Sequence, residues 1–461
     1  MKENIIKALK TIVGSDYVLT NKDQTASYLY DEVEEAYRPK ANIDSIVIKP
    51  KNTQDVSQIM KLANENKIPV VIRGGATGLC GGCTPVEESF VLSMERMNGI
   101  LEIDRKNMVA VLEAGVTLMD LLEELEKSND LSFPVHPGDE GAQMGGMAVT
   151  NAGGARAVRH GVMRKHIMGV EAVLPNGEIL ELGGKLVKNN AGYNLMQLLL
   201  GSEGTLAVIT KIVLKIYPKD FYSATIVAPF ENFEDACQAV MDILKNGNLP
   251  LAVEYMDKHL FVGTAEMLGL EWQAKKGNAD LLIILSEKNE RQLYEACKEI
   301  NEICEKNHSY ETLYAGKAKE QQELLLIRSQ HYEYIKETIC DSFDMAVPVS
   351  EVPAFIKDLK MLVREYDTNT NVIAHIADGN VHNDILYLED GTVPSYASEL
   401  KQKMYDICFS YGGTITGEHG IGKIRTKDLT LQKSPVELEL MQGIKKVFDP
   451  NNIMNPKTVL M

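Results

Sequence analysis

Two histidines on either side of a turn dipeptide are the side chains in this sequence best placed to bind a metal ion. His375 and His382 flank Asp378-Gly379, a pair of residues that favours a tight turn between antiparallel strands. If this dipeptide forms the centre of a two-residue turn, His375 pairs directly with His382, and both imidazoles lie on one face of a sheet. Such imidazoles can bind one ion, or they can simply pack or hydrogen-bond across the sheet.

A third potential ligand follows later in the chain. Glu418 stands in Gly417-Glu-His-Gly420, where the glycines allow the loop to present its side chains to a site. Two histidines and one carboxylate with open coordination positions suit Fe(II), Mn(II) or Zn(II). We therefore predict one divalent metal ion, held by His375, His382 and Glu418.

Glycine-rich loops lie upstream. The first, residues 73–82, follows a short apolar strand at 70–72. Glycine allows backbone N–H groups to approach a phosphate without a Cβ in the way. The loop matches neither the GxGxxG nor the P-loop pattern, and alone it could be an ordinary surface turn. Further glycine-rich segments at 136–146, 151–154 and 201–204 favour a large phosphate-bearing ligand that several loops share.

Short strands and helices must position these loops. Apolar runs predict strands at 46–48, 70–72, 90–92 and 109–114. The helical pattern predicts a helix over 53–66, capped by Thr53, and another around 118–126. Pro175-Asn176-Gly177 predicts the turn of a hairpin spanning 170–182. After Tyr217-Pro218 glycine becomes scarce, and helices with acidic faces alternate with strands as far as about Gly413.

Composition excludes several classes of function. The net charge of the 461 residues is -17, which disfavours nucleic acid as a ligand. No apolar run approaches the ~18 residues of a membrane span, so we do not expect an integral membrane protein. The first 14 residues predict an amphipathic helix rather than a signal peptide.

The cysteines point to a reducing environment. Seven cysteines are too sparse for a secreted disulfide framework, so we expect a cytoplasmic protein. Cys80 and Cys83 form a CxxC inside the first glycine loop; we interpret them as small residues of a tight loop, with a redox or metal pair as the alternative. The spacing of the cysteines does not suit an iron–sulfur cluster.

As a set, the glycine motifs resemble the FAD-binding domain of the vanillyl-alcohol-oxidase type, also called the p-cresol-methylhydroxylase (PCMH) type. More narrowly, the chain is similar to the D-lactate dehydrogenase and glycolate oxidase flavoprotein-subunit branch, from about residue 44 to residue 456. The motifs that carry the resemblance are Arg73-Gly-Gly-Ala-Thr-Gly-Leu-Cys-Gly-Gly82, Pro137-Gly-Asp139, Gly145-Gly-Met-Ala148, Asn151-Ala-Gly-Gly154, Leu174-Pro-Asn-Gly177 and Gly201-Ser-Glu-Gly-Thr-Leu206.

The resemblance implies an α+β fold. The FAD-binding domain would combine a small α/β part with a larger mixed sheet, and an α+β cap domain would be built on an antiparallel sheet. We expect the FAD domain at 1–219, the substrate-binding cap at 220–412, and a C-terminal segment, 413–461, that returns to the FAD domain and the active site.

The resemblance also implies one FAD per chain. Some relatives attach flavin through a histidine in the first loop; no histidine occurs there, so we expect noncovalent FAD. His160 stands where many relatives have tyrosine, which leaves its role open. By position, the pyrophosphate would lie against Arg73, Gly74, Gly75, Thr77, Gly78 and Gly82; the flavin and ribityl chain along Pro137, Gly138, Asp139, Gly145, Gly146, Ala148, Asn151 and Gly154; and the adenine or ribose by Glu203, Gly204 and Ile209.

The metal-dependent members of this family carry HxxDGNxH and a later Glu-His, which match His375, His382 and Glu418 here. The implied activity is oxidation of a small D-2-hydroxy acid, with D-lactate as the first expectation. That reaction removes the hydroxyl proton and transfers hydride from C2 to flavin N5. A bound divalent metal would lower the pKa of the substrate hydroxyl.

Three further residues complete the expected site. His419 is the expected general base, because a neutral imidazole accepts protons near pH 7. Arg328 aligns with the family arginine that binds the substrate carboxylate, a task suited to a guanidinium, although in the sequence alone it could be a surface or salt-bridge arginine. Tyr332 is expected to line the pocket. Asn380 and Asp384 would orient the metal ligands.

Alternatives remain open at this stage. Glycolate and D-2-hydroxyglutarate are rival substrates. A non-redox FAD transferase of the alkyl-dihydroxyacetone-phosphate synthase type, and a non-catalytic electron-transfer flavoprotein, are rival functions. The expected electron acceptor is a protein, with electron-transferring flavoprotein subunits that link the oxidation to NAD as one hypothesis.

Overall fold

The computed structural model describes residues 2–247 and 249–460, and the chain divides into two compact units. Unit 1 comprises Met1–Gly153, Val162–Pro218 and Glu418–Met461; unit 2 comprises Gly154–Gly161 and Lys219–Gly417. The expected domain limits, 219/220 and 412/413, lie near two of these changes of unit. The short segment Gly154–Gly161 interrupts unit 1 at a place that the sequence analysis did not indicate.

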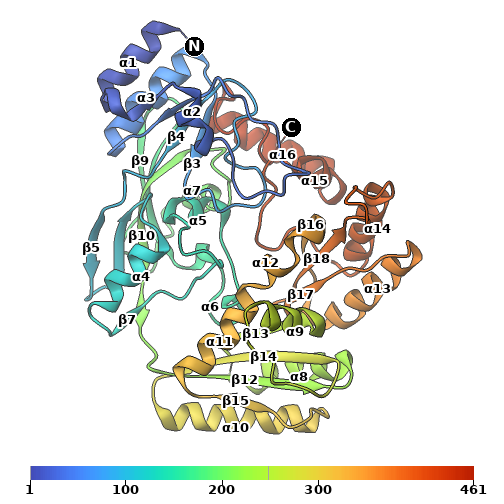
Figure 1. Ribbon diagram of the computed structural model, residues 1–461. Helices are drawn as coiled ribbons and strands as arrows, with labels where there is room; N and C mark the ends of the chain where they lie inside the picture. Colours follow the sequence, from blue (N-terminus) through green and yellow to red (C-terminus); the bar gives the residue numbers. More distant parts are fainter. Residues whose placement is uncertain (1, 248, 461) are drawn as a thin grey trace. The chain divides into compact units, whose positions relative to one another are not determined.

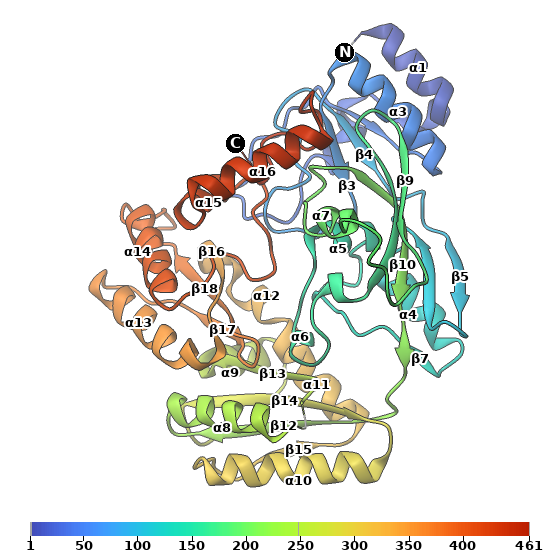
Figure 2. The same cartoon turned by 180° about the vertical axis from the view of Figure 1, so that it is seen from behind.

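A four-stranded sheet of order β1-β2-β4-β3 opens unit 1. Strands β2, β4 and β3 run parallel, and β1 joins β2 antiparallel. Helices α1 and α3 lie side by side, as Figure 2 shows, and their apolar faces join the buried core of these strands. The bounds are β1 Val18–Leu19, β2 Ile46–Ile48, β3 Val70–Arg73, β4 Phe90–Ser93, α1 Glu3–Val13, α2 Lys22–Thr25 and α3 Thr53–Asn66.

The predicted helix over 53–66 is therefore confirmed, but its predicted cap is wrong. Asn52 is the N-cap, and its side chain accepts the backbone N–H of Asp55. Thr53 is already helical. An asparagine side chain satisfies an otherwise unpaired N–H of the first turn as well as a threonine does, so the sequence offered two adjacent candidates.

A five-stranded antiparallel sheet of order β5-β6-β10-β8-β9 forms the larger part of unit 1. Its inward side chains, with those of α4 and α5, make a second core. The hairpin predicted at 170–182 is β8 and β9, closed by a hydrogen bond from Gly177 N–H to Leu174 O. The bounds are β5 Ile100–Asp104, β6 Val109–Glu113, β8 Ile167–Val173, β9 Ile179–Gly183, β10 Val208–Lys215, the two-stranded pair β7 Leu131–Ser132 and β11 Tyr217–Pro218, α4 Leu118–Glu126, α5 Met144–Thr150, α7 Leu195–Leu199, α15 Thr426–Gln432 and α16 Pro435–Phe448.

Unit 2 is built on one seven-stranded sheet of order β15-β12-β14-β13-β17-β18-β16, in which every neighbouring pair is antiparallel. Figure 1 shows this sheet with its helices. The strand bounds are β12 Tyr222–Phe230, β13 Ala252–Asp257, β14 Ala279–Glu287, β15 Leu313–Ala315, β16 Ile339–Ala346, β17 Val372–His375 and β18 Asn380–Leu386.

Helices cover both faces of that sheet. Side chains of α9, α11 and α12 share a core with one face, whereas α8, α10, α13 and α14 pack elsewhere on the sheet and on one another. The expected α+β class, with an antiparallel-sheet cap, is confirmed. Within the described ranges, no helix combines the length and apolar character needed to cross a membrane. The helix bounds are α6 Ala157–His160, α8 Phe233–Asn246, α9 Lys258–Met267, α10 Glu290–Lys306, α11 Ala318–Ser329, α12 His331–Ile335, α13 Val352–Glu365 and α14 Ala397–Ser410.

Candidate functional site

A cavity of about 1370 Å³, part of it open to solvent, lies within unit 1. The glycine loops that were predicted to share one ligand all contribute to its wall. The predicted cofactor residues that line it are Gly74, Gly75, Thr77, Gly78, Gly82, Pro137, Asp139, Gly145, Gly146, Glu203, Gly204 and Ile209.

Close backbone contacts between the loops explain several of these glycines. A Cβ on Gly75 would lie 2.4 Å from the carbonyl oxygen of Gly141, so the first loop packs directly on the second. A Cβ on Gly145 would lie 2.8 Å from the Cβ of Ala114 on the adjoining sheet. By contrast, Gly82 and Gly146 line the cavity and have nothing within 4 Å of such an atom. Their lack of a side chain keeps the cavity open.

Buried polar atoms in the cavity wall fit FAD. Asp31 Oδ1 and Gln143 Oε1 are buried and have no hydrogen-bond partner within the described residues, and both residues line the cavity. Buried polar atoms normally have a partner. Hydroxyl groups of a ribityl chain and N–H groups of a flavin or adenine ring are donors of the required kind. Neither residue was predicted: Asp31 lies outside the glycine-rich segments, and Gln143 lies within the segment 136–146 but is not one of its glycines.

The other predicted cofactor residues lie outside the cavity lining. The Arg73 guanidinium donates to Tyr30 O at 2.7 Å and to Ser27 O at 3.1 Å, so it holds the N-terminal segment against the first loop. Asn151 ends α5 and accepts the Arg164 N–H. Gly138, Ala148 and Gly154 are the remaining three, and Gly154 belongs to unit 2.

Glu203 holds the C-terminal glycine loop in place. Its buried carboxylate accepts the backbone N–H groups of Ile421 at 2.9 Å and Gly422 at 2.7 Å. Burial raises the pKa of Glu203, and these two hydrogen bonds partly offset that effect. The Lys423 ammonium next to this loop donates to Gly82 O at 2.8 Å, and burial lowers its pKa to about 8. The late glycine segment is therefore tied to the first loop within unit 1.

Cys80 is a buried residue of the loop, and Cys83 is half-buried. The Cys80 thiol donates to Gly420 O at 3.2 Å, and burial raises the pKa of Cys83 to about 11. Neither cysteine forms a disulfide within the described residues. A protonated thiol is a poor nucleophile and metal ligand, which favours the structural interpretation of this CxxC over a redox pair.

In unit 2, the two predicted metal-binding histidines lie on one face of the sheet, but the predicted register is wrong. His375 pairs with Asn380, and His382 pairs with Ile373. The imidazoles are therefore diagonal neighbours, with ring centroids 5.4 Å apart. The connection occupies residues 376–379, and only Gly379 among them has a positive φ, 88°. A two-residue type I′ turn would require a positive φ at both central residues, so Asp378-Gly379 does not form one.

His375 and Arg328 share one buried carboxylate. Glu254 Oε1 lies 2.7 Å from His375 Nδ1, and Glu254 Oε2 accepts from Arg328 Nε at 2.7 Å. Glu254 is 1% exposed. Burial alone would raise its pKa, but His375 and Arg328 outweigh burial and hold it at about 2. His331 Nδ1 lies 2.7 Å from Arg328 O, and burial followed by the Arg328 charge lowers the pKa of His331 to about 3.

His382 lies beside a different carboxylate, Asp344 on β16. His382 Nδ1 and Asp344 Oδ1 are 3.6 Å apart. Asp344 also accepts the Gly417 backbone N–H at 2.7 Å through its carbonyl oxygen and at 3.0 Å through Oδ2. Gly417 is the last residue of unit 2, and Glu418 and His419 follow it directly. Chain continuity therefore brings these two side chains to Asp344.

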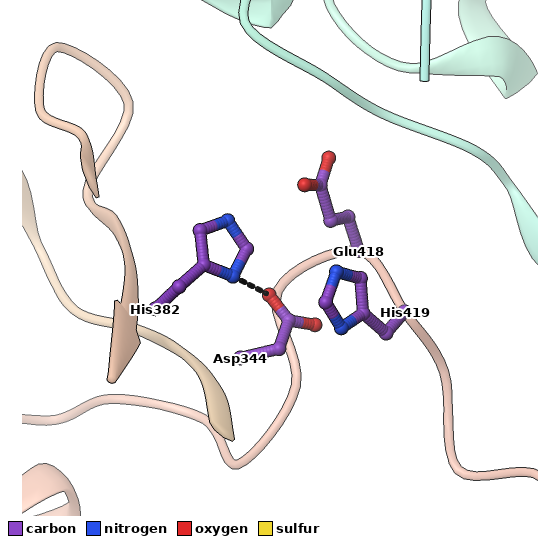
Figure 3. Close-up of side chains that lie close together, drawn as sticks. All are labelled: Asp344, His382, Glu418 and His419. Carbon is purple, nitrogen blue, oxygen red and sulfur yellow. Dashed lines mark ion pairs between the residues drawn. The ribbon is translucent and has the colours of Figure 1, made fainter. Parts of the chain in front are cut away.

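Figure 3 shows the resulting group of four side chains: Asp344, His382, Glu418 and His419. One potential ligand atom from each lies within 4.8 Å of the others. Two of the three predicted metal ligands, His382 and Glu418, belong to this group, together with the predicted base His419. His375 does not belong to it, and Asp344 was not predicted. Imidazole and carboxylate donors in this number suit Mn(II), Fe(II) or Zn(II).

Glu418 and His419 also line the cavity of unit 1. Gly153 approaches this loop so closely that a Cβ there would lie 2.6 Å from Glu418 Oε2. The remaining predicted residues are not members of the metal-ligand group. The Asn380 amide donates to Asp344 Oδ1 at 2.8 Å, whereas Asp384 accepts from Ser342 Oγ. Tyr332 on α12 is 39% exposed.

Comparison with known proteins identifies the family. Residues 220–459 match the model described as FAD linked oxidases, C-terminal domain, and residues 45–183 match the model described as FAD binding domain. The chain belongs to the FAD-linked oxidases, and the predicted family is confirmed. It is thus a flavin-dependent oxidoreductase, and the cavity residues described above fit its FAD.

Similar proteins cover nearly the whole chain. A D-lactate dehydrogenase of Archaeoglobus fulgidus is 39% identical over 434 residues, 94% of this chain and 95% of the relative. A D-lactate dehydrogenase of Anaerostipes hadrus is 33% identical over 95% of this chain and 94% of its own length. Among solved structures, p-cresol methylhydroxylase with bound substrate has a TM-score of 0.77 at 18% identity and covers 99% of this chain and 96% of its own, a likeness that concerns the fold.

Proposed function

We propose that this protein oxidises a small D-2-hydroxy acid, with D-lactate as the leading substrate and pyruvate as its product. The observation that carries the proposal is the position of Glu418 and His419, which line the cofactor cavity and also belong to the group of potential metal ligands. A substrate held by that group lies beside the residues that would accept its proton. The names of the two similar dehydrogenases support D-lactate over glycolate or D-2-hydroxyglutarate.

Bound FAD would supply the two-electron acceptor at the cavity. A divalent metal held by His382, Glu418 and either His375 or Asp344 would supply Lewis acidity for the hydroxyl oxygen of the substrate. His419 would accept the hydroxyl proton. Arg328 would bind the carboxylate, and Tyr332 would border the pocket.

Electrons would then leave FAD for a protein acceptor. The described cysteines form no disulfide and do not have the spacing of a cluster-binding set, so an internal iron–sulfur relay is not part of the proposal. We propose a cytoplasmic electron-transferring flavoprotein linked to NAD as that acceptor. A pull-down from native cells should recover flavoprotein subunits; repeated recovery of another redox protein would contradict this choice.

The activity is tested by anaerobic reduction of the bound flavin. The purified protein is analysed for FAD and for metal content, and D-lactate, L-lactate, glycolate and D-2-hydroxyglutarate are then added in separate cuvettes. We expect D-lactate to bleach the visible flavin band fastest, and chelation of the metal to prevent bleaching without loss of FAD. Bleaching by L-lactate alone, or by none of the four acids, would contradict the proposed function.

A further inference from the structure

Glu254 occupies an unusual position for a carboxylate. It lies in the interior strand β13 and is 1% exposed, and burying an ionised carboxylate is costly unless charged or hydrogen-bonding partners compensate it. Both of its oxygens are used. Oε1 lies 2.7 Å from His375 Nδ1, and Oε2 accepts a hydrogen bond from Arg328 Nε at 2.7 Å. One carboxylate therefore connects a predicted metal ligand with the predicted substrate-binding arginine.

The contact with His375 decides which ring nitrogen carries the proton. An ionised carboxylate is an acceptor only, so the hydrogen bond requires a proton on His375 Nδ1. The other nitrogen, Nε2, then carries the lone pair with which a neutral imidazole binds a metal. Carboxylates that accept from the second nitrogen of a ligating histidine fix its tautomer and ring orientation in this way.

The contact with Arg328 fixes the guanidinium. Nε and Nη2 both face Glu254 Oε2, so the edge that carries Nη1 points away from this carboxylate. On that side Nη1 lies 3.4 Å from His331 Nδ1. Arg328 is 14% exposed along its side chain, and a guanidinium held along one edge keeps a defined direction for a second anion.

We propose that Glu254 is a positioning residue that sets the tautomer of His375 and the direction of Arg328 at the same time. The inference rests on the proposed function, because it assumes a metal at the histidines and a carboxylate substrate at the arginine. It makes one buried side chain responsible for both the affinity for the metal and the affinity for the substrate.

The alternative is an ion pair that only stabilises unit 2. The variant Glu254→Gln distinguishes the positioning role from the purely structural role. A glutamine has one acceptor oxygen and one amide donor, so it can accept from His375 or from Arg328 but not from both, while its size is unchanged. Loss of a purely structural pair would lower the melting temperature without a specific effect on metal or substrate.

The matched control is Asp257→Asn. Asp257 lies on the same strand, is 8% exposed, and accepts from Lys360 Nζ at 2.6 Å and from the Val372 N–H. Because side chains alternate along a strand, Asp257 points to the opposite face from Glu254. The control thus removes a buried, paired carboxylate of β13 without touching His375 or Arg328.

The experiment compares the wild type and both variants, each carrying FAD. Equilibrium dialysis gives the Kd for Co²⁺, steady-state kinetics gives KM and kcat for D-lactate, and ¹⁵N NMR of the histidine rings gives the tautomer of His375 without metal or substrate. For Glu254→Gln we expect about 10–100-fold weaker Co²⁺ binding, a KM raised more than kcat is lowered, and a mixture of tautomers at His375. Asp257→Asn should match the wild type in all three.

The outcomes distinguish the inference from the function on which it rests. Wild-type values for Glu254→Gln in Co²⁺ affinity, KM and tautomer would overturn the inference alone. Equal losses in both variants would also overturn it, because they indicate general loosening of unit 2. A wild-type protein that neither binds Co²⁺ nor oxidises any 2-hydroxy acid would overturn the proposed function itself, while the tautomer measurement would still test whether Glu254 sets the His375 ring.

Discussion

The Arg328 guanidinium can contact two anions at once, whereas a lysine ammonium cannot do so in a fixed geometry, and this difference should change the KM for the proposed substrate. Nε and Nη2 engage Glu254, and the remaining edge is the proposed contact for the substrate carboxylate. A lysine has a single ammonium that cannot serve both anions in a fixed geometry. We expect Arg328→Lys to raise KM for D-lactate about 10–100-fold, since a hydrogen bond to a charged group contributes ~1.5–3 kcal/mol.

The control for this prediction is Arg364→Lys. Arg364 is an exposed residue in the last turn of α13 and, among the described residues, forms no hydrogen bond or ion pair with Glu254 or His375, so its replacement should leave KM unchanged. Steady-state kinetics with D-lactate checks both variants. If Arg328→Lys kept the wild-type KM, Arg328 could not be the residue that binds the substrate carboxylate.

Asp280 makes the stability of unit 2 depend on pH. It is fully buried on β14, and burial raises its pKa to about 6, although the Trp272 Nε1–H bond and Lys258 act in the opposite direction. Between pH ~3.8 and ~6 the folded protein binds a proton that the unfolded chain has released. The contribution of this group to the free energy of unfolding is therefore present at low pH and is lost as pH rises, by at most about 1.4 kcal/mol per pH unit.

Asp280→Asn tests this dependence, because an asparagine oxygen still accepts from Trp272 but does not ionise. The variant should become more stable relative to the wild type as pH rises from 4 to 7. Urea denaturation at four or five pH values measures the difference in the free energy of unfolding. A difference that stays constant across this range would show that Asp280 does not titrate with a raised pKa.

At the scale of single residues, the sequence could predict what a motif contains but not what packs against it. His375, His382 and Glu418 stand in a recognisable pattern. Asp344 and Glu254 do not, because each lies in a strand of mixed apolar and acidic residues with no motif around it. An inward-pointing charge in such a strand is the one available indication, and its partners become known only when the order of the strands is known.

The turn between β17 and β18 depends on a glycine for two separate reasons. Gly379 has a φ of 88°, and a Cβ there would lie 2.0 Å from Val347 O. Gly391 has a φ of 77° but has nothing within 4 Å of the same position. The loss of stability in Gly391→Ala thus measures backbone strain alone, about 1–2 kcal/mol. In Gly379→Ala the clash between the new Cβ and Val347 O adds to this strain.

We expect Gly379→Ala to lower the free energy of unfolding by about 1–3 kcal/mol more than Gly391→Ala, because a backbone carbonyl must move to make room. Thermal or urea denaturation measures both. The displaced turn should also weaken Co²⁺ binding, since it joins the strands that carry His375 and His382. Equal losses of stability in the two variants would mean that the contact with Val347 is unimportant.

Helix α5 should show opposite effects of one methyl group on stability and on cofactor binding. Gly146 lies within this helix and lines the cavity, with nothing within 4 Å of a Cβ. Alanine favours helix over glycine by up to about 1 kcal/mol, so Gly146→Ala should stabilise the FAD-free protein. The same methyl enters the space proposed for FAD and should raise the Kd for FAD about tenfold.

Gly443→Ala is the matched helix control. Gly443 lies within α16, also has nothing within 4 Å of a Cβ, and does not line the cavity. It should stabilise the protein without changing FAD affinity, as measured by fluorescence titration of the FAD-free protein. Unchanged FAD affinity in Gly146→Ala would place the cofactor away from α5.

At the scale of elements, apolar periodicity was sufficient for the bounds of several helices and strands but not for their exact pairing. The helix over 118–126 and the strand at 46–48 have the predicted bounds. The β17–β18 hairpin shows that apolar periodicity does not predict strand register. Its register depends on a four-residue connection in which Gly379 lies against Val347, and no local sequence rule contains that contact.

For the whole molecule, His382 is separated from cofactor binding, because it lies outside the lining of the cofactor cavity, whereas the potential metal ligand Glu418 lines that cavity. Every residue of the cofactor cavity belongs to unit 1, whereas His382 belongs to unit 2. We therefore expect His382→Ala to bind one FAD per chain, as the wild type does, and yet to lose metal affinity and flavin reduction by D-lactate. His308→Ala is the control, because His308 is an exposed histidine of unit 2, 80% accessible along its side chain.

Three measurements on the same preparations check this separation: the flavin-to-protein ratio, the bound metal, and the rate of anaerobic bleaching. A flavin reduced by D-lactate at the wild-type rate in His382→Ala would remove this histidine from the reaction. Loss of FAD together with loss of metal would instead show that the two units bind their ligands cooperatively, since a change in unit 2 would then alter a cavity whose lining it does not share. His308→Ala should keep both ligands and the wild-type rate in either case.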